Sequence, residues 1–214
     1  MKRGFDLVLA LAGILLFWPL LVLVAIAVKL DSRGPVFFRQ ERVGRNFKTF
    51  GILKFRTMHA GQDEEEGPLI TASGDKRVTG TGRFLRKYKL DELPQLINVL
   101  KGEMSLVGPR PEVGKYVEIF RPDYERLLKV RPGITDPASL GFSNEEDLLS
   151  AGGDREEDYY VRKILPEKIR LSSEYIEQMG FLADLKIILR TVLKSWLSNP
   201  ARRGGTEQGG TKAS

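Results

Sequence analysis

The chain lacks cysteine altogether and has a single histidine, His59, among its 214 residues. A protein without cysteine has no disulfide framework and no thiolate metal site. One histidine also excludes a histidine-based zinc site and a Ser-His-Asp triad, and we expect His59 to be a surface residue. Any catalysis by this chain must therefore depend on carboxylates and on cationic side chains.

Acidic residues are scarce over much of the first half of the chain, and the net charge is +6. Residues 1–58 have ten Lys or Arg against three Asp or Glu, and residues 76–110 have eight against three. The segment 59–75 has five acidic residues and no Lys or Arg, and the composition of 61–76 predicts a mobile loop. This distribution of positive charge suits anionic lipid headgroups and a phosphorylated substrate. We find no nucleic-acid-binding motif among the basic residues, so no nucleic-acid partner is expected.

The segment from Leu7 to Val28 has no charged residue and is almost wholly apolar. As a continuous helix, at about 1.5 Å per residue, it would extend roughly 33 Å, which is enough to cross a bilayer core. Pro19 lies near its middle, and basic residues flank both ends, so the positive-inside rule does not decide which end crosses. A re-entrant helix that bends at Pro19 and returns to the same leaflet satisfies both facts, and we predict Pro19 as the membrane kink. A straight span and a cleavable signal peptide are the alternatives.

The adjacent carboxylates Asp91 and Glu92 lie between two groups of cationic residues. The sequence GRFLRK precedes them at 82–87, and VGPRP follows at 107–111. Carboxylates among cations indicate a site that binds a second anion, such as a pyrophosphate, with a carboxylate ready to act on it. The alternative is that both are simply the first turn of a helix, where acidic side chains interact well with the helix dipole.

The pattern of residues predicts mainly helices and two short strands. Two short strands are expected within 35–58 around a turn at Gly44, and a Gly/Pro-rich loop is expected over 103–111. Helices are expected over 80–88, 91–100 and 113–130, a polar loop over 134–158, and an amphipathic helix over 183–197. That last helix either packs on the core or lies in a membrane interface. The chain thus divides into a membrane helix (1–30), a catalytic domain (31–197) and a disordered tail (198–214).

Several long motifs occur in one order along the chain: Lys2-Arg3-x-Phe5-Asp6, DSRGPVFFRQERVGRN at 31–46, KFRTM at 54–58, LDELPQLINVLKGEMSLVGPRPE at 90–112, and RPGIT at 131–135. Together with DLK at 184–186, they closely resemble the bacterial sugar transferase family. These are small monotopic phosphoglycosyl transferases that start glycan assembly on a polyprenyl phosphate. The resemblance implies a compact α/β domain (α+β, mainly helical) on one membrane leaflet, held by a re-entrant N-terminal helix and by interfacial amphipathic helices.

The resemblance also implies a reaction: transfer of a sugar 1-phosphate from a UDP-sugar to polyprenyl (undecaprenyl) phosphate, with release of UMP and a requirement for Mg²⁺. Asp91 matches the nucleophile that forms a phosphosugar intermediate and would also be a ligand of Mg²⁺, and Glu92 matches its catalytic partner. The UDP-sugar and the polyprenyl phosphate are both anions, and two successive displacements let each attack be stabilised separately. We expect the catalytic domain on the cytosolic face of the bacterial cytoplasmic membrane, in contact with anionic lipids. Assembly into a homo-oligomer is left open.

Further residues are expected at the phosphate or nucleotide groups: Lys54, Arg56, Arg86, Pro109, Arg110 and Pro111. The resemblance carries the expectation for the arginine five residues before Asp91 and for the Pro-Arg-Pro loop. Structural salt bridges are the alternative for both arginines, and simple solvation is the alternative for the basic pair at 54 and 56. After residue 135, where many relatives have Gly-Trp-Ala-Gln, this chain has Asp136-Pro137, so the identity of the sugar does not carry over. A non-catalytic membrane module that recruits partners through its basic face is the competing hypothesis.

Overall fold

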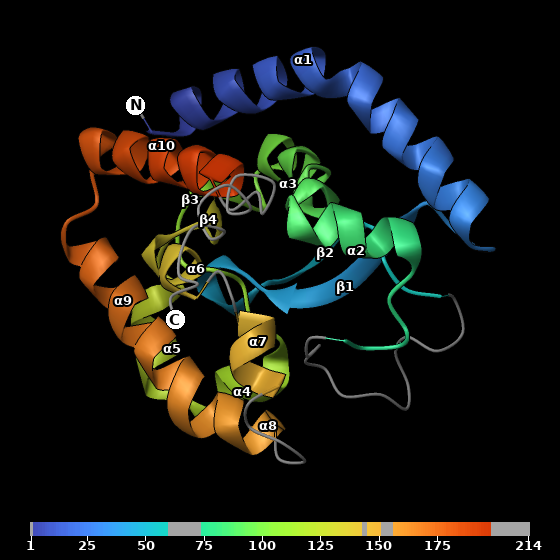
Figure 1. Cartoon of the computed structure of the whole chain (residues 1–214). Helices are drawn as coiled ribbons and strands as arrows, with labels where there is room; N and C mark the ends of the chain where they lie inside the picture. Colours follow the sequence, from blue (N-terminus) through green and yellow to red (C-terminus); the bar gives the residue numbers. More distant parts are fainter. Residues whose placement is uncertain (1, 60–73, 143–144, 151–155, 198–214) are drawn as a thin grey trace, which may run out of the picture.

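The structure, a computed structural model, describes residues 2–59, 74–142, 145–150 and 156–197. Most of the expected acidic loop at 61–76 and all of the expected tail at 198–214 lie outside these residues. Figure 1 shows helices α1 and α10 along one side of the molecule, a β-hairpin in the middle, and a group of shorter helices on the opposite side. The described chain is mainly helical with two small sheets, which confirms the α+β prediction.

Helix α1 (Lys2–Asp31) is long and apolar enough to cross a membrane, and most of it is exposed. It continues through Pro19, which has no backbone N–H to donate to the preceding turn. In Figure 1 the helix follows an arched path over the rest of the molecule. Both ends of this arched helix contact the rest of the molecule. Near the first end Lys2 donates to the carbonyl of Val107 (2.9 Å), and at the second end the Asp31 carboxylate accepts from the backbone N–H of Thr81 (2.9 Å).

The hairpin pairs β1 (Phe37–Val43) with β2 (Thr49–Phe55) in antiparallel register, from Phe37 opposite Phe55 to Val43 opposite Thr49. A short 3₁₀ turn, η1 (Arg45–Phe47), joins the strands, as the turn prediction at Gly44 requires. Aromatic and β-branched residues favour the extended conformation in both strands.

The second sheet was not expected from the sequence. It pairs β3 (Ser105–Val107) with β4 (Gly133–Thr135) in parallel, inside segments that were predicted to be loops. Strands of three residues are too short to show a period of two, and these strands are far apart in the chain, so local pattern does not reveal them. Beside the sheet, a Cβ on Gly133 would overlap the backbone of Gly108, so this close crossing requires glycine.

Three elements carry the residues between the two sheets: α2 (Gly80–Lys87), a 3₁₀ turn η2 (Leu90–Glu92), and α3 (Gln95–Lys101). The helix predicted over 80–88 is confirmed. Gly102 ends α3 in the left-handed conformation, which glycine adopts readily. The prediction that Asp91 begins a regular helix to Leu100 is wrong. Pro94 has no N–H to donate, and the backbone N–H of Leu93 donates to Leu90 three residues earlier, so Asp91 lies in a separate 3₁₀ turn.

The remaining helices follow β3 in the chain, and α10, the last of them, returns to the side of α1. They are α4 (Gly114–Ile119), α5 (Arg121–Leu127), α6 (Pro137–Gly141), α7 (Glu145–Ser150), α8 (Glu156–Tyr159), a π-helical turn η4 (Tyr160–Ile164), α9 (Leu165–Glu177) and α10 (Phe181–Leu197). The single helix predicted over 113–130 is broken at Phe120, because Pro122 cannot donate to the preceding turn. The predicted polar loop over 134–158 instead contains a strand and short helices. The amphipathic helix predicted over 183–197 is confirmed.

Buried side chains hold α1 to the domain at two places. Ala10 packs with Ile52, Val99 and Met104 of β2, α3 and the chain after it. Further along α1, Val24 and Val28 pack with Phe55 and Leu85 of β2 and α2. The arch of α1 therefore lies directly over the elements that flank η2.

Candidate active site

The two carboxylates Asp91 and Glu92 are both buried, with 7% and 9% of their surfaces exposed. They occupy the 3₁₀ turn η2, which is preceded by Lys89 in the left-handed conformation (φ 56°) and followed by Pro94. Lys89 thus lies between the end of α2 and the start of η2. Non-glycine residues rarely adopt this conformation, and such positions are often found at functional sites.

Glu92 is held by two cations from distant parts of the chain. The Lys54 ammonium on β2 donates to Oε1 at 2.9 Å, and the Arg110 guanidinium donates to Oε2 at 3.2 Å and also to Oε1. Burial by itself would raise the pKa of Glu92, but the charges of Arg110 and Lys54 outweigh burial and hold that pKa well below its usual value. Burial lowers the pKa of Lys54, although Glu92 opposes this effect, and Glu92 raises the pKa of Arg110. Glu92 is therefore an ionised carboxylate with both oxygens engaged.

Asp91 has the opposite environment. Its Oδ1 is buried and has no hydrogen-bond partner among the described residues. Burial raises the pKa of Asp91, the negative charge of Glu92 raises it further, and the cations Lys54, Lys89 and Arg86 partly oppose the rise. Two neighbouring carboxylates with pKa values pushed apart have distinct chemical roles. Asp91 is the carboxylate with an unpaired oxygen, and its raised pKa makes it the more basic of the two.

A second unpartnered group lies close to Asp91 along the chain. The side-chain amide of Gln95 is fully buried, and neither its oxygen nor its nitrogen has a hydrogen-bond partner among the described residues. Buried polar groups in proteins are nearly always paired, so two unpaired groups four residues apart indicate that a ligand or a water completes the site. The sequence analysis did not single out Gln95.

Arg86 reaches the site from α2. Its Nε donates to the Thr57 hydroxyl at 2.9 Å, and its charge acts on Asp91. α2 can lie this close to the chain after β2 because a Cβ on Gly82 would overlap the Thr57 carbonyl oxygen. The Thr79 hydroxyl caps the helix by accepting from the N–H of Gly82 at 2.9 Å.

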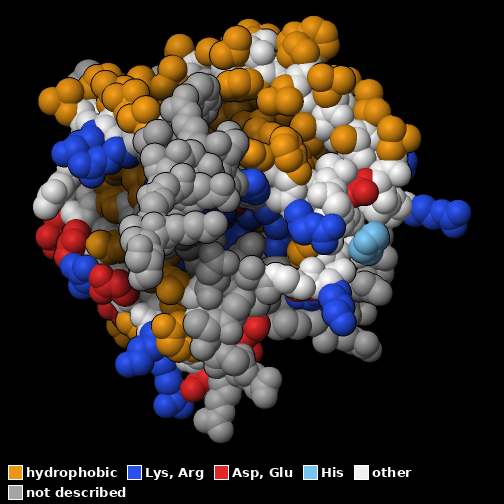
Figure 2. All heavy atoms as spheres, in the orientation of Figure 1, with side chains coloured by type: hydrophobic (Ala, Val, Ile, Leu, Met, Phe, Trp, Pro, Cys, Tyr) orange, Lys and Arg blue, Asp and Glu red, His pale blue; other side chains and the backbone are white. Residues whose placement is uncertain are grey.

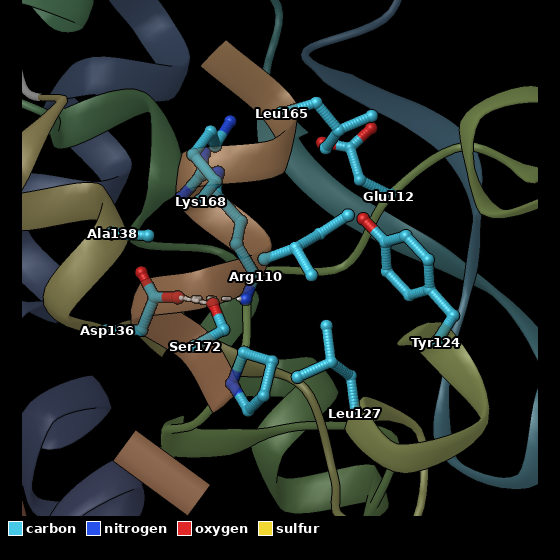
Figure 3. A pocket seen from close by; sticks show the side chains of 11 residues that line it. Arg110, Glu112, Tyr124, Leu127, Asp136, Ala138, Leu165, Lys168 and Ser172 are labelled. Carbon is cyan, nitrogen blue, oxygen red and sulfur yellow. Dashed lines mark hydrogen bonds between the residues drawn. The ribbon is translucent and has the colours of Figure 1, made fainter. Parts of the chain in front are cut away.

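Arg110 is positioned by its own backbone as well as by Glu92. Figure 3 shows the Asp136 carboxylate between Arg110 and Ser172: one oxygen accepts from the Arg110 N–H (3.4 Å) and from the Ser172 hydroxyl (3.0 Å). The other oxygen of Asp136 accepts from the Ser139 N–H at 2.7 Å and so caps α6. The cavity beside these groups has a volume of about 10 Å³, room for one water at most. The sequence analysis noted Asp136 only as a departure from relatives, although an Asp before Pro137 is a recognisable helix start.

The remaining predicted residues lie in different surroundings. Pro109 and Pro111 are buried on either side of Arg110. Arg56 is buried and donates to the carbonyl (2.8 Å) and hydroxyl (2.9 Å) of Ser32, just after α1, while its Nε and one terminal nitrogen have no partner among the described residues. Pro19 is exposed on α1, and His59 is exposed as predicted. The structure thus brings Lys54, Arg86 and Arg110 to the carboxylate pair, and it places Arg56 at the end of α1.

The donors available for a divalent metal are few. Within the described ranges no group of three or more His, Asp or Glu side chains is close enough to bind an ion. Mg²⁺ commonly takes one or two carboxylates and completes its shell with substrate phosphates and water. The open Oδ1 of Asp91 fits such a shared site, whereas both oxygens of Glu92 are already paired.

Comparison with known proteins agrees with the family resemblance seen in the sequence motifs. The family described as bacterial sugar transferase matches residues 1–198. The chain is 42% identical over 197 residues to the UDP-glucose:undecaprenyl-phosphate glucose-1-phosphate transferase of Caulobacter vibrioides, covering 89% of this chain and 68% of that protein. It is 39% identical over 194 residues to the UDP-N-acetylgalactosamine-undecaprenyl-phosphate N-acetylgalactosaminephosphotransferase of Aeromonas hydrophila, covering 89% and 42%.

A shorter relative matches along most of its length. The exopolysaccharide production protein PSS of Rhizobium leguminosarum is 35% identical over 202 residues, which cover 90% of this chain and 94% of that protein. In contrast, the chain spans between about a third and two thirds of the length of several other relatives.

Proposed function

Because this chain belongs to the bacterial sugar transferase family, we propose that it transfers a sugar 1-phosphate from a UDP-sugar to undecaprenyl phosphate and releases UMP. The observation that carries the proposal is the pair of buried carboxylates with opposed environments, surrounded by cations from three segments of the chain. The names of the relatives support the substrates. Since one relative is named for glucose and another of similar identity for N-acetylgalactosamine, we leave the sugar open.

In the proposed mechanism, Asp91 attacks first. One oxygen of its carboxylate forms a bond to the phosphorus that carries the sugar, and the bond from this phosphorus to the bridging oxygen breaks, so UMP leaves with that oxygen. An oxygen of undecaprenyl phosphate then attacks the same phosphorus, and the bond to Asp91 breaks to restore the carboxylate. Each displacement needs positive charge nearby, and Lys54, Arg86 and Arg110 provide it.

Glu92 has a supporting role in this mechanism. Its low pKa makes it a poor proton acceptor, and both of its oxygens accept from Lys54 or Arg110. We infer that Glu92 holds these two cations beside Asp91 and so fixes the positive charge that faces the phosphates. Bound Mg²⁺ would neutralise charge on the diphosphate and the departing UMP. The second oxygen of the Asp91 carboxylate is the group we propose as its protein ligand.

Membrane association is part of the proposal. Figure 2 shows hydrophobic side chains gathered along the side formed by α1 and α10. Many are well exposed, including Leu16 and Leu23 on α1 and Leu182 and Leu193 on α10. Since both ends of α1 contact the same domain, a re-entrant path in one leaflet is consistent with the arch, and we propose it. The domain would then lie on the cytosolic face of the inner membrane, with the UDP-sugars.

The test is UMP release from a panel of UDP-sugars, with Mg²⁺ and undecaprenyl phosphate in detergent micelles. We expect one or a few UDP-sugars to give UMP and a lipid-linked sugar. Failure of every sugar under conditions in which a related enzyme is active would favour the competing hypothesis of a non-catalytic recruitment module.

Asp91→Asn tests the role of the nucleophile. A neutral amide cannot act as the anionic nucleophile, so transfer should be lost. Activity within about tenfold of the unaltered protein, roughly 1.4 kcal/mol of barrier, would rule out this role. A UDP-sugar supplied without acceptor should also leave a sugar phosphate on the Asp91 peptide, and mass spectrometry that finds only unmodified peptide during turnover would count against the covalent route.

A further inference from the structure

The end of strand β4 contacts Arg110 at two neighbouring points. The guanidinium of Arg110 donates to the backbone carbonyl of Ile134 at 3.4 Å, through the same nitrogen that donates to Oε2 of Glu92. The backbone N–H of Arg110 donates to the Asp136 carboxylate, also at 3.4 Å. Thr135, the last residue of β4, lies between these two contacts. The position of β4 therefore sets both the backbone and the guanidinium of Arg110.

The side chain of Thr135 is buried and forms a hydrogen bond with α10. Its hydroxyl oxygen lies 2.7 Å from the hydroxyl oxygen of Thr191. The Thr191 hydroxyl donates its proton to the carbonyl of Ile187, one turn earlier in α10, at 2.9 Å. Because a hydroxyl has only one proton to donate, Thr135 is the donor in the bond between the two threonines. This bond joins α10 to the strand that contacts Arg110.

The same helix also holds the neighbouring strand, β3 (Figure 1). Asp184 is buried two turns before Thr191 in α10, where it pairs with Lys2 and accepts from the Tyr175 hydroxyl at 2.6 Å. Lys2 and Tyr175 both donate to the carbonyl of Val107, the last residue of β3, at 2.9 and 3.4 Å. Positions seven residues apart lie on one face of a helix, at roughly 10 Å along its axis. One face of α10 therefore fixes the ends of both strands.

We propose that Thr191 and Thr135 are positioning residues for the transfer reaction, which act by holding Arg110 beside Glu92; this rests on the function proposed above. The two contacts of Arg110 with the end of β4 are long hydrogen bonds, so a small shift of the strand takes them beyond bonding distance. The guanidinium then no longer has a fixed direction, and the positive charge that each displacement needs is misplaced. The helix whose exposed apolar face we place on the lipid thus also holds a cation of the active site.

The test is the rate of UMP release by the full chain in detergent micelles when the bond between the threonines is removed. In Thr135→Val the Thr191 hydroxyl keeps its bond to Ile187, so no buried hydroxyl loses its only partner. This variant should lower kcat/KM about tenfold, since a misplacement of about 1 Å can cost about a hundredfold. Thr135→Ser keeps the hydroxyl and is the matched control, with activity close to that of the unaltered protein. Thr191→Val and Thr191→Ser form a second pair and should give the same pattern.

A double-mutant cycle separates positioning from a general loss of stability. In an Arg110→Gln background the side chain that the threonines position is absent, so Thr135→Val should cause little further loss of kcat/KM. A purely structural defect would lower kcat/KM by the same factor in both backgrounds, and that result would overturn the proposal.

A second measurement does not depend on activity. The nitrogen–proton NMR signal of the Arg110 guanidinium is identified by its loss in Arg110→Gln. This signal should shift or broaden in Thr135→Val and in Thr191→Val, and it should stay in place in both serine variants. An unchanged signal in both valine variants would overturn the proposal. If the signal moves as expected but no UDP-sugar yields UMP, the proposed function fails and the role of the threonines in holding Arg110 stands.

Discussion

At the scale of single residues, two adjacent carboxylates of the same chemistry acquire different properties from their neighbours. Glu92 faces Lys54 and Arg110, which stabilise its charged form. Asp91 is buried with one oxygen unpaired and has the like charge of Glu92 beside it, so its charged form is disfavoured. An ionised carboxylate in such a place is poorly solvated and therefore reactive. Substrate phosphates and Mg²⁺ would meet Asp91 and not Glu92.

The pH dependence of activity should report the environment of Asp91. Its pKa is raised in the folded protein, so kcat/KM should fall as the pH decreases through that pKa and the carboxylate becomes protonated. Lys54 lowers the pKa of Asp91, and Lys54→Gln removes this effect, so the acidic limb of the pH profile should move to higher pH. Lys87→Gln, an exposed cation on α2, is the control and should leave the limb in place. A limb that moves to lower pH in Lys54→Gln would contradict this account.

At the scale of elements, the site depends on how closely α2 and α1 approach the hairpin. α2 can lie against Thr57 only because residue 82 is glycine, and this approach brings Arg86 to the carboxylates. α1 lies over η2 because small and medium apolar residues, Ala10 at one end and Val24 and Val28 at the other, pack against β2, α2 and α3.

Gly82→Ala should therefore lower both stability and activity. The added Cβ overlaps a backbone oxygen, which cannot move as a flexible side chain can, and overpacking of this kind costs about 1–3 kcal/mol. Gly80→Ala, in the same helix with only Asp31 within 4 Å of the added atom, is the control. Thermal unfolding in detergent should show a lower midpoint for Gly82→Ala alone. Equal midpoints for the two variants would mean that α2 tolerates a shift.

Pro19→Leu tests whether proline sets the arch of α1. Leucine restores a backbone donor and gives an uninterrupted helix that is long enough to span a bilayer. A cysteine at Gly4, where an added Cβ has no neighbour within 4 Å, reports the side of the N-terminus in this cysteine-free chain. In intact cells Gly4→Cys should resist a membrane-impermeant thiol reagent, and the double variant should be labelled in part.

Absence of labelling in the double variant, with activity unchanged, would show that Pro19 is not what holds the arch. The contacts of Lys2 with Val107 and of Ala10 with the α3 region would then be sufficient.

At the scale of the whole molecule, the apolar surface is continuous across elements that are far apart in the chain. α10 lies beside the first turns of α1, where Phe181 and Phe5 are in edge-to-face contact with ring centres 5.0 Å apart. The Lys2 ammonium pairs with Asp184 of α10, whose other oxygen accepts from the Tyr175 hydroxyl at 2.6 Å. The ends of the described chain thus form one surface with the arch (Figure 2).

An interfacial position for α10 predicts that its outer face contacts lipid. An environment-sensitive fluorophore on Leu189→Cys should shift its emission to the blue on binding to anionic vesicles, and a quencher in the acyl chains should quench it. The control is Leu148→Cys on α7, also exposed but on the opposite side of the molecule, which should show neither effect. Equal quenching at both positions, or none at Leu189, would exclude this orientation.

The sequence by itself determined the chemistry and the broad architecture. The lack of cysteine and the single histidine left carboxylates and cations for catalysis, and the uncharged run from Leu7 to Val28 required a long apolar helix. The hairpin, α2 and α10 followed from local periodicity, and several motifs identified the family. These features could be predicted because each depends on residues close together in the chain.

The tertiary structure determined which charged and polar side chains pair with one another. Lys54 and Arg110 lie 38 and 18 positions from Glu92, and no local pattern shows that both pair with it and leave Asp91 open. The same holds for Asp136 beside Arg110, for the sheet of β3 and β4, and for the contact of Arg56 with Ser32 just after α1. Such contacts arise because a buried charged or polar group without a hydrogen-bond partner destabilises the fold. The partners within its reach depend on how the whole chain packs.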